Sequence, residues 1–229
     1  MKSEKQLGPA KDKIKVLIVD DHPIVREGLV RLIELQADLV VCGEAANVPD
    51  ALRAIETLDP DIAVVDLSLD RDLGGIELIK EIKMRFSQVP VLVLSMHDET
   101  VFAERMIRAG AKGYVMKEEA PDAILTAIRR VSKGEIYLSD NMAARILSNV
   151  AGGHSKTKKF PTERLSDREL EVLELIGQGF GASQIAEKLF LSVKTIETYY
   201  LHLKEKLRLE NAGKLRQYAI KWVQCKRSM

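Results

Sequence analysis

Short apolar runs alternate with amphipathic segments from Ile14 to about Val131. The runs are four to six residues long, which is typical of buried strands. We predict strands over residues 14–19, 39–44, 62–65, 91–94 and 113–116. Segments with helical spacing of apolar residues separate and follow them, over residues 24–35, 51–58, 76–85, 101–109 and 121–131. This alternation predicts a five-stranded, doubly wound parallel sheet of the flavodoxin-like α/β class over residues 14–133.

The pattern changes after this region. An amphipathic stretch over residues 139–149 precedes the segment AGGHSKTKKFPT, whose Gly, Ser, Lys and Pro content is typical of a flexible tether. We therefore expect a linker helix and tether over residues 134–162. Helical patterns without any strand signal follow over residues 167–177, 183–189, 193–206 and 212–223. They predict a small all-α domain over residues 163–225.

Charge is distributed unevenly over the two predicted domains. From Ser155 onward the chain has 15 Lys and Arg against 9 Asp and Glu, whereas the preceding part has 20 against 25. The excess of basic residues favours binding of a polyanionic partner to the C-terminal domain. The excess of acidic residues favours binding of a metal ion to the first domain.

The cysteine content and the hydropathy of the chain indicate the cellular compartment of the protein. The two cysteines, Cys42 and Cys225, form no CxxC pair, so we expect free thiols and no zinc site. The N-terminal segment has no apolar core, and no stretch approaches the roughly 18 apolar residues of a membrane span. We expect a cytoplasmic protein.

Reactive side chains follow four of the five predicted strands. Asp20 and Asp21 end the first strand, and the other ends carry Asp66, Ser95 and Lys117. Ligands of open parallel sheets bind at the carboxyl ends of the strands. Three carboxylates that meet there need a cation, and Mg²⁺ prefers such oxygen ligands. Each residue alone is ordinary, but the combination predicts a magnesium site.

Such a pocket also suits phosphoryl chemistry. An Asp can act as a nucleophile and form an acyl phosphate, while Mg²⁺ and Lys117 neutralise the phosphoryl oxygens and Ser95 donates a hydrogen bond to one of them.

The segments VLIVDDHPIVREGL, DIAVVDLSL, VLVLSMHDE and AKGYVMKEEAPDAILTAIRRV resemble the receiver domains of two-component response regulators. The resemblance implies that Asp66 is the phosphoacceptor and that Ser95 and Lys117 contact the phosphoryl group. It also implies a set of Mg²⁺ ligands, namely Asp20, Asp21, Asp66 and the main-chain carbonyl of Ser68. Tyr114 stands where the family has its switch aromatic residue.

One loop departs from the family pattern. Receivers usually have Pro four residues after the acceptor Asp, whereas this chain reads DLSLDRDLGGIEL, with Asp70 at that position and one extra residue before Gly75. We expect this loop, with Asp70 and Asp72 at the rim of the pocket, to change reaction rates or partner choice while the chemistry is retained.

The C-terminal pattern contains two helices joined by a short turn. Ser192 is a good N-cap for the second helix, and Ile196, Leu203 and Leu207 have the spacing of a core-facing stripe. A mixed outward face remains, with side chains suited to phosphates and base edges in a major groove. Its members are Lys194, Glu197, Thr198, Tyr200, Leu201 and Lys204. A small helical bundle without DNA would show the same periodicity.

The segments LSDRELEVLELIGQG, SQIAEKLFLSVKTIETYY and KEKL resemble the LuxR-type helix-turn-helix, and its combination with a receiver resembles the NarL/FixJ type of response regulator. The resemblance implies a helix-turn-helix over residues 181–200, a DNA-reading helix over residues 193–206 and a dimerising helix over residues 212–223. The expected DNA-binding residues are Lys194, Thr195, Glu197, Thr198, Leu201 and Lys204. Glu197 and Tyr199 replace a common basic residue and a His, and Glu197 can accept from a cytosine amino group.

The function implied is a DNA-binding response regulator. A partner sensor histidine kinase, docking beside the first helix near Ile24, Arg26 and Glu27, phosphorylates Asp66 and thereby switches homodimer formation and promoter binding. The alternative is a pseudo-receiver transcription factor that acts without phosphorylation. We expect no enzyme, because a Mg²⁺-dependent phosphatase with an aspartyl nucleophile would have a second Asp where this chain has Ser68.

Overall fold

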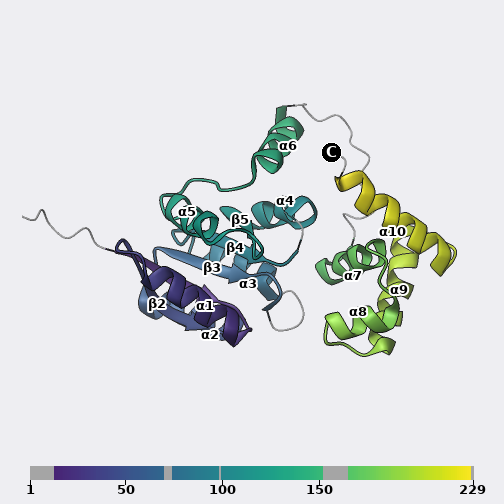
Figure 1. The fold of residues 1–229 in the computed structure, drawn as a ribbon, viewed down its shortest axis with the longest axis horizontal. Coiled ribbons are helices and arrows are strands. Elements are labelled where there is room, and N and C mark those ends of the chain that lie inside the picture. Colours follow the sequence, from purple (N-terminus) through teal and green to yellow (C-terminus); the bar gives the residue numbers. More distant parts are fainter. Residues whose placement is uncertain (1–12, 70–73, 98, 152–164, 228–229) are drawn as a thin grey trace, which may run out of the picture. The chain divides into compact units, whose positions relative to one another are not determined.

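The computed structural model describes residues 13–69, 74–97, 99–151 and 165–227. The chain divides into two compact units, one with a five-stranded sheet and one with the C-terminal helices (Figure 1). The predicted loop at Asp70 and Asp72, most of the predicted tether and the N-terminal segment lie outside the described residues. Among the helices of the described part, none is long and apolar enough to cross a membrane.

All strands of the first unit run parallel. The sheet has the order β2-β1-β3-β4-β5, so β1 and β3 are central neighbours and their carboxyl ends lie at the same edge. The strands are β1 (Ile14–Val19), β2 (Leu39–Ala45), β3 (Ile62–Asp66), β4 (Val91–Ser95) and β5 (Gly113–Met116). The five predicted strands are confirmed, and three of them extend one residue further. Asp66 and Ser95 are therefore the last residues of their strands.

Four helices connect the strands and a fifth follows β5, in the predicted order. They are α1 (Pro23–Glu34), α2 (Val48–Leu58), α3 (Gly74–Arg85), α4 (Glu99–Ala109) and α5 (Pro121–Val131). The prediction for α2 began three residues too late. The Asn47 side chain accepts a hydrogen bond from Asp50 N at 2.9 Å, and a proline occupies the first turn, so the helix begins directly after Asn47.

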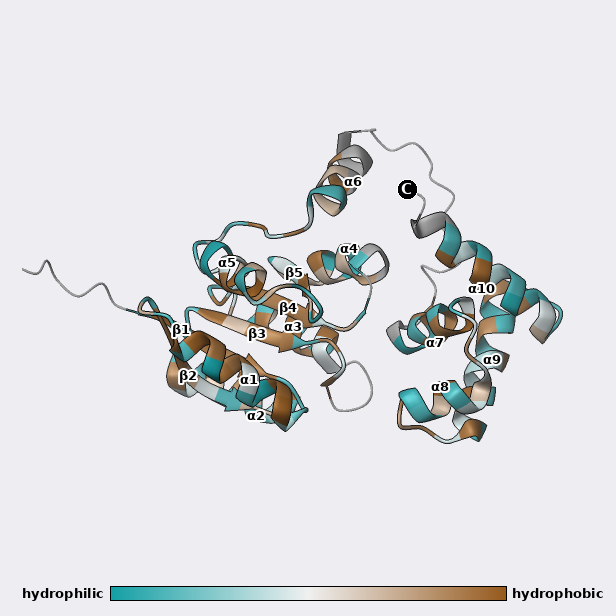
Figure 2. Ribbon diagram, viewed as in Figure 1, coloured by the Kyte–Doolittle hydropathy of each residue, from teal (hydrophilic) through white to brown (hydrophobic). Residues whose placement is uncertain are grey.

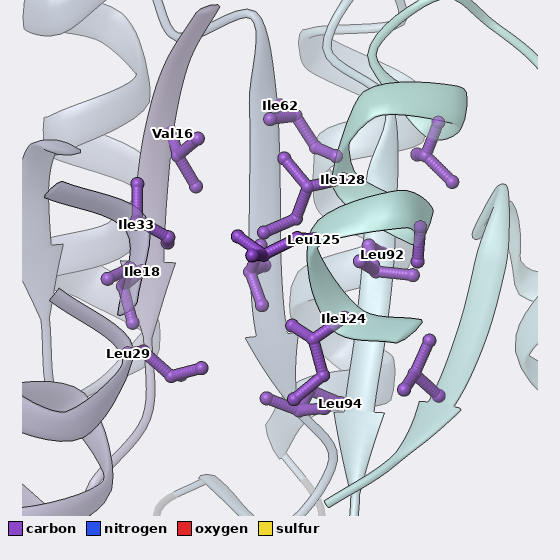
Figure 3. Packing of buried hydrophobic residues seen from close by; sticks show 14 of the residues in the cluster. Val16, Ile18, Leu29, Ile33, Ile62, Leu92, Leu94, Ile124, Leu125 and Ile128 are labelled. Atoms are coloured by element: carbon purple, nitrogen blue, oxygen red, sulfur yellow. The ribbon is translucent and has the colours of Figure 1, made fainter. Parts of the chain in front are cut away.

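One face of the sheet is covered by α1 and α5. Leu29 and Ile33 of α1 and Ile128 of α5 pack onto alternate strand residues, among them Val16 and Ile62 (Figure 3). Alternate residues of a strand point to opposite faces, yet the central strands β3 and β4 are buried along their whole length and largely hydrophobic (Figure 2). A parallel sheet with both faces buried has this composition.

The second unit contains α6 (Asp140–Ala151), where a linker helix was predicted. The helices predicted for the all-α domain follow as α7 (Asp167–Gly177), α8 (Ala182–Lys188), α9 (Val193–Leu207) and α10 (Ala212–Arg227). Helix α7 packs against α8, α9 and α10. The predicted core stripe of α9 is confirmed, because Ile196, Leu203 and Leu207 are all buried.

Gly75, in the first turn of α3, touches the backbone that carries Asp66. A Cβ atom at Gly75 would lie 2.7 Å from the Cα of Leu67 and still closer to the carbonyl oxygen of Asp66. We expect Gly75→Ala to lower the free energy of unfolding by about 1–3 kcal/mol. Urea denaturation of the full chain, followed by circular dichroism, measures the loss.

Gly28→Ala is the matched control, because Gly28 lies inside α1 and a Cβ atom there meets nothing within 4 Å. It should stabilise the chain by up to about 1 kcal/mol through helix propensity. Equal effects of the two substitutions would contradict the packing described for Gly75.

Candidate functional site

A buried cluster of charges lies at the carboxyl edge of the sheet. Asp20 follows β1, Asp66 ends β3 and Lys117 follows β5. The ammonium nitrogen of Lys117 lies 2.6 Å from Asp20 Oδ2 and 2.9 Å from Asp66 Oδ2. Both carboxylates are almost fully buried. The sheet thus brings together side chains that are up to 97 residues apart in the sequence.

The cluster holds more negative than positive charge. Burial raises the pKa of Asp66, the charge of Asp20 adds to this effect, and Lys117 opposes it. Burial also disfavours the charge on Lys117, but the carboxylates of Asp66 and Asp20 outweigh it, so the pKa of Lys117 is raised. Within the described part of the chain, Asp66 Oδ1 is buried and has no hydrogen-bond partner. This oxygen can therefore bind a cation or act as a nucleophile.

The geometry fits a small metal ion. Asp20, Asp21, His22 and Asp66 each offer one ligand atom, and these atoms lie within 4.8 Å of one another. Three of the four are carboxylates, which suit a hard cation such as Mg²⁺, and the buried Asp66 Oδ1 needs the compensation that a cation supplies.

His22 was missed by the sequence reasoning, although it follows the two aspartates directly. Its backbone N–H donates to Asp20 Oδ1 at 2.8 Å, and its Nδ1 lies 2.8 Å from Asp21 Oδ1. His22 therefore orients the Asp20 carboxylate through a hydrogen bond and lies close to the Asp21 carboxylate.

Ser95 and Tyr114 lie on the neighbouring strands β4 and β5. Ser95 is fully buried at the end of β4, and its carbonyl oxygen accepts from Lys117 N at 2.8 Å. Tyr114 on β5 is 1% exposed and pairs with Val93 of β4. The Ser68 N–H donates to the Asp66 carboxylate, but this hydrogen bond only partly offsets burial, which raises the pKa of Asp66.

In the second unit, α8 and α9 form a helix-turn-helix. The Ser192 side chain accepts from Thr195 N at 3.0 Å, which confirms the predicted N-cap of α9. In the turn before it, Phe190 is 77% exposed and has a φ of 52°, a conformation that bulky side chains rarely adopt.

The outward face of α9 is mixed in character. Lys194, Glu197, Thr198 and Leu201 are exposed. Tyr200 and Lys204, the other residues predicted for this face, are only partly exposed, as is Thr195, which was predicted to bind DNA. The Thr198 hydroxyl donates to the Lys194 carbonyl oxygen at 3.1 Å, so its hydrogen is used within the helix.

Glu169 of α7 fixes α9 from the other side. The Ser166 N–H and Lys206 Nζ both donate to Glu169 Oε2 at 2.7 Å, and the Ser166 side chain accepts from Glu169 N. Burial alone would raise the pKa of Glu169, but these hydrogen bonds lower it. The sequence reasoning missed this residue, although Ser-x-x-Glu before an apolar run is the signal of a capping box.

Comparisons with known proteins find a matching family for both the N-terminal and the C-terminal part of the chain. The model of the response regulator receiver domain matches residues 16–129, and that of bacterial regulatory proteins of the luxR family matches residues 163–219. The oxygen regulatory protein NreC of Staphylococcus carnosus is 34% identical over 91% of this chain and 97% of its own length.

Solved structures of similar overall fold include the RcsB response regulator of Salmonella typhimurium, with a TM-score of 0.59, 29% identity, and coverage of 92% of this chain and 98% of RcsB. A structure of RcsB bound to promoter P1flhDC in the presence of the phosphomimetic BeF3- has a TM-score of 0.57 and 31% identity, and covers 91% of this chain and 98% of RcsB.

We expect Glu169→Gln to lower the free energy of unfolding by about 1–2 kcal/mol at neutral pH, because the part-buried contact with Lys206 loses its negative charge while an amide oxygen can still accept from the Ser166 N–H. The pKa of Glu169 is lowered in the folded state. Its contribution is therefore fully present above the usual pKa of a glutamate and disappears as the pH falls through the lowered value. The difference between wild type and variant should shrink in acid.

Fluorescence of Trp222, the single tryptophan of the chain, reports unfolding of the helical unit in urea. Glu205→Gln is the matched control on the exposed side of α9, with an expected change within about 0.5 kcal/mol. A difference for Glu169→Gln that does not depend on pH would refute the assigned ion pair.

Proposed function

The chain belongs to the response regulators that join a receiver domain to a LuxR-type DNA-binding domain, and we propose that phosphorylation of Asp66 switches its binding to promoter DNA. The family consists of transcription regulators rather than enzymes. The observation that carries the proposal is the arrangement of Asp66, which is buried and has one unpaired oxygen beside Lys117.

Asp66 is the proposed nucleophile. Its carboxylate oxygen attacks the phosphorus of a phosphohistidine on a sensor histidine kinase, an O–P bond forms and the N–P bond breaks, and the imidazole keeps the electron pair. Lys117 then pairs with a phosphoryl oxygen in place of the Asp66 carboxylate, and the Ser95 hydroxyl donates to another.

The proposed ligands of Mg²⁺ are Asp20, Asp21, Asp66 and the main-chain carbonyl of Ser68. When bound, Mg²⁺ would neutralise charge on the transferred phosphoryl group. His22 supports this site by holding the Asp20 carboxylate in place through its backbone N–H.

The signal is proposed to leave the pocket through Ser95 and Tyr114. A hydrogen bond to the phosphoryl group draws Ser95 inward, and the buried Tyr114 ring on the adjacent strand repacks into the space. The face formed by α4, β5 and α5 changes as a result and favours a homodimer.

The proposed kinase contact is the exposed start of α1. Ile24 is 85% exposed, and the Glu27 side chain is 69% exposed. The Arg26 side chain is 18% exposed and engaged within the receiver, since its Nη1 donates to Asp20 O at 2.6 Å. We therefore assign docking to Ile24 and Glu27, and to Arg26 the orientation of the Asp20 backbone.

DNA contact is assigned to the outward face of α9 and homodimer contact to α10 and the receiver. A helix-turn-helix places its second helix in the major groove, and two linked copies read two half-sites. RcsB, which resembles this chain, has been solved on promoter DNA. Because the DNA partner lies in the cytoplasm, we place the protein there too.

We expect the phosphate mimic beryllofluoride with Mg²⁺ to tighten binding of the full chain to a selected DNA duplex by about tenfold, or about 1.4 kcal/mol. Fluorescence anisotropy measures the dissociation constant. Neither Asp66→Ala nor wild type in EDTA should respond to beryllofluoride, because both lack a required ligand. High affinity that beryllofluoride leaves unchanged would instead identify a regulator that acts without phosphorylation.

Lys204→Ala should weaken binding to all duplexes alike and reduce the slope of log K against log salt by about one unit, because one phosphate contact is lost. Lys80→Ala is the control, since Lys80 is an exposed lysine of α3 in the receiver. An unchanged salt slope for Lys204→Ala removes this lysine from the phosphate contacts.

A further inference from the structure

Leu201 occupies the middle of the outward face of α9. It follows Lys194 by seven residues, Glu197 by four and Thr198 by three, spacings that place all four side chains on one side of a helix. The Leu201 side chain is 49% exposed, whereas Ile196 and Leu203 on the opposite side are fully buried. A large apolar side chain is thus surrounded by polar ones on the face assigned to DNA.

The chemistry of the major groove limits what Leu201 can contact there. Its side chain has no hydrogen-bond donor or acceptor. The base edges in the groove present acceptors, amino groups and one apolar group, the C5-methyl of thymine. Burial of that methyl against Leu201 is the favourable contact available to it.

Glu197, one helical turn before Leu201, is an exposed carboxylate on the same face. A carboxylate is repelled by the N7 and O6 acceptors of guanine, so it needs an amino group as its partner. In an A·T pair the adenine amino group lies between two acceptors, N7 and the thymine O4, whereas the cytosine amino group has an acceptor on one side only. Cytosine is therefore the base that suits Glu197.

Thr198 adds little polar selectivity. Its hydroxyl hydrogen is donated to the Lys194 carbonyl oxygen within α9, which leaves the Lys194 ammonium as the donor among these four side chains. The centre of the face thus lacks the paired donors that recognise guanine.

We propose that Leu201 reads the methyl group of a thymine in the major groove, next to a G·C pair that Glu197 recognises through its cytosine. The inference rests on the proposed function of α9. It specifies the base preference of this site through two residues, one apolar and one acidic.

The experiment uses the full-length protein with beryllofluoride and a duplex selected from random DNA. Each thymine of the duplex is replaced in turn by deoxyuridine, which lacks only the methyl group, and the dissociation constant is measured by anisotropy. For wild type, one position should raise the constant about three- to fivefold, the effect of exposing a single methyl group. For Leu201→Ala, the same replacement should have no effect.

Leu35→Ala is the matched control, because Leu35 is 81% exposed and lies in the receiver. This variant should keep the full deoxyuridine penalty. For Glu197→Gln, a repeated selection should exchange the G·C pair for A·T, since glutamine pairs with adenine.

The outcomes separate the two proposals. Wild type that discriminates its selected duplex from random DNA but tolerates deoxyuridine everywhere, or a Leu201→Ala variant that keeps the penalty, overturns the reading of thymine alone. Wild type that binds all duplexes equally overturns the assignment of α9 as a sequence reader, and with it this inference.

Discussion

The ammonium group of Lys117 between two buried carboxylates is the contact on which the first unit depends. Asp20 and Asp66 are almost fully buried, and charges placed there without a partner would cost several kcal/mol. Lys117 reaches both within 3 Å, but one cation does not balance the remaining carboxylate. The ion pairs with Lys117 offset the cost of burying the two carboxylates, but the pocket keeps an excess of negative charge. A site that binds a metal ion together with a phosphoryl group needs this excess, because the metal ion supplies the missing positive charge.

Much of this pocket could be predicted from the sequence, because parallel strands bring their carboxyl ends to one edge. Asp20, Asp66, Ser95 and Lys117 were found in this way. The ion pairs that form among these side chains at the edge of the sheet could not be predicted. That Lys117 pairs with Asp20 as well as Asp66 depends on strand order and side-chain length, and sequence spacing encodes neither.

Other features were missed although local signals existed. The start of α2 followed from Asn47 and the proline after it, and the role of Glu169 followed from the capping box with Ser166. The spacing of apolar residues does not indicate such polar contacts, because each of them is a single hydrogen bond and not a repeated stripe of side chains. The bridge between Gly113 and Tyr137 had no signal, since it joins a strand to residues beyond the following helix.

The close contact of Gly75 with the Asp66 carbonyl also limits how this protein can vary during evolution. Any side chain at position 75 would push on the backbone of the acceptor residue, so this position tolerates no other amino acid well. Leu67 and Leu69, between Asp66 and Gly75, are fully buried as well, so substitutions that change their size would also move the backbone beside the acceptor.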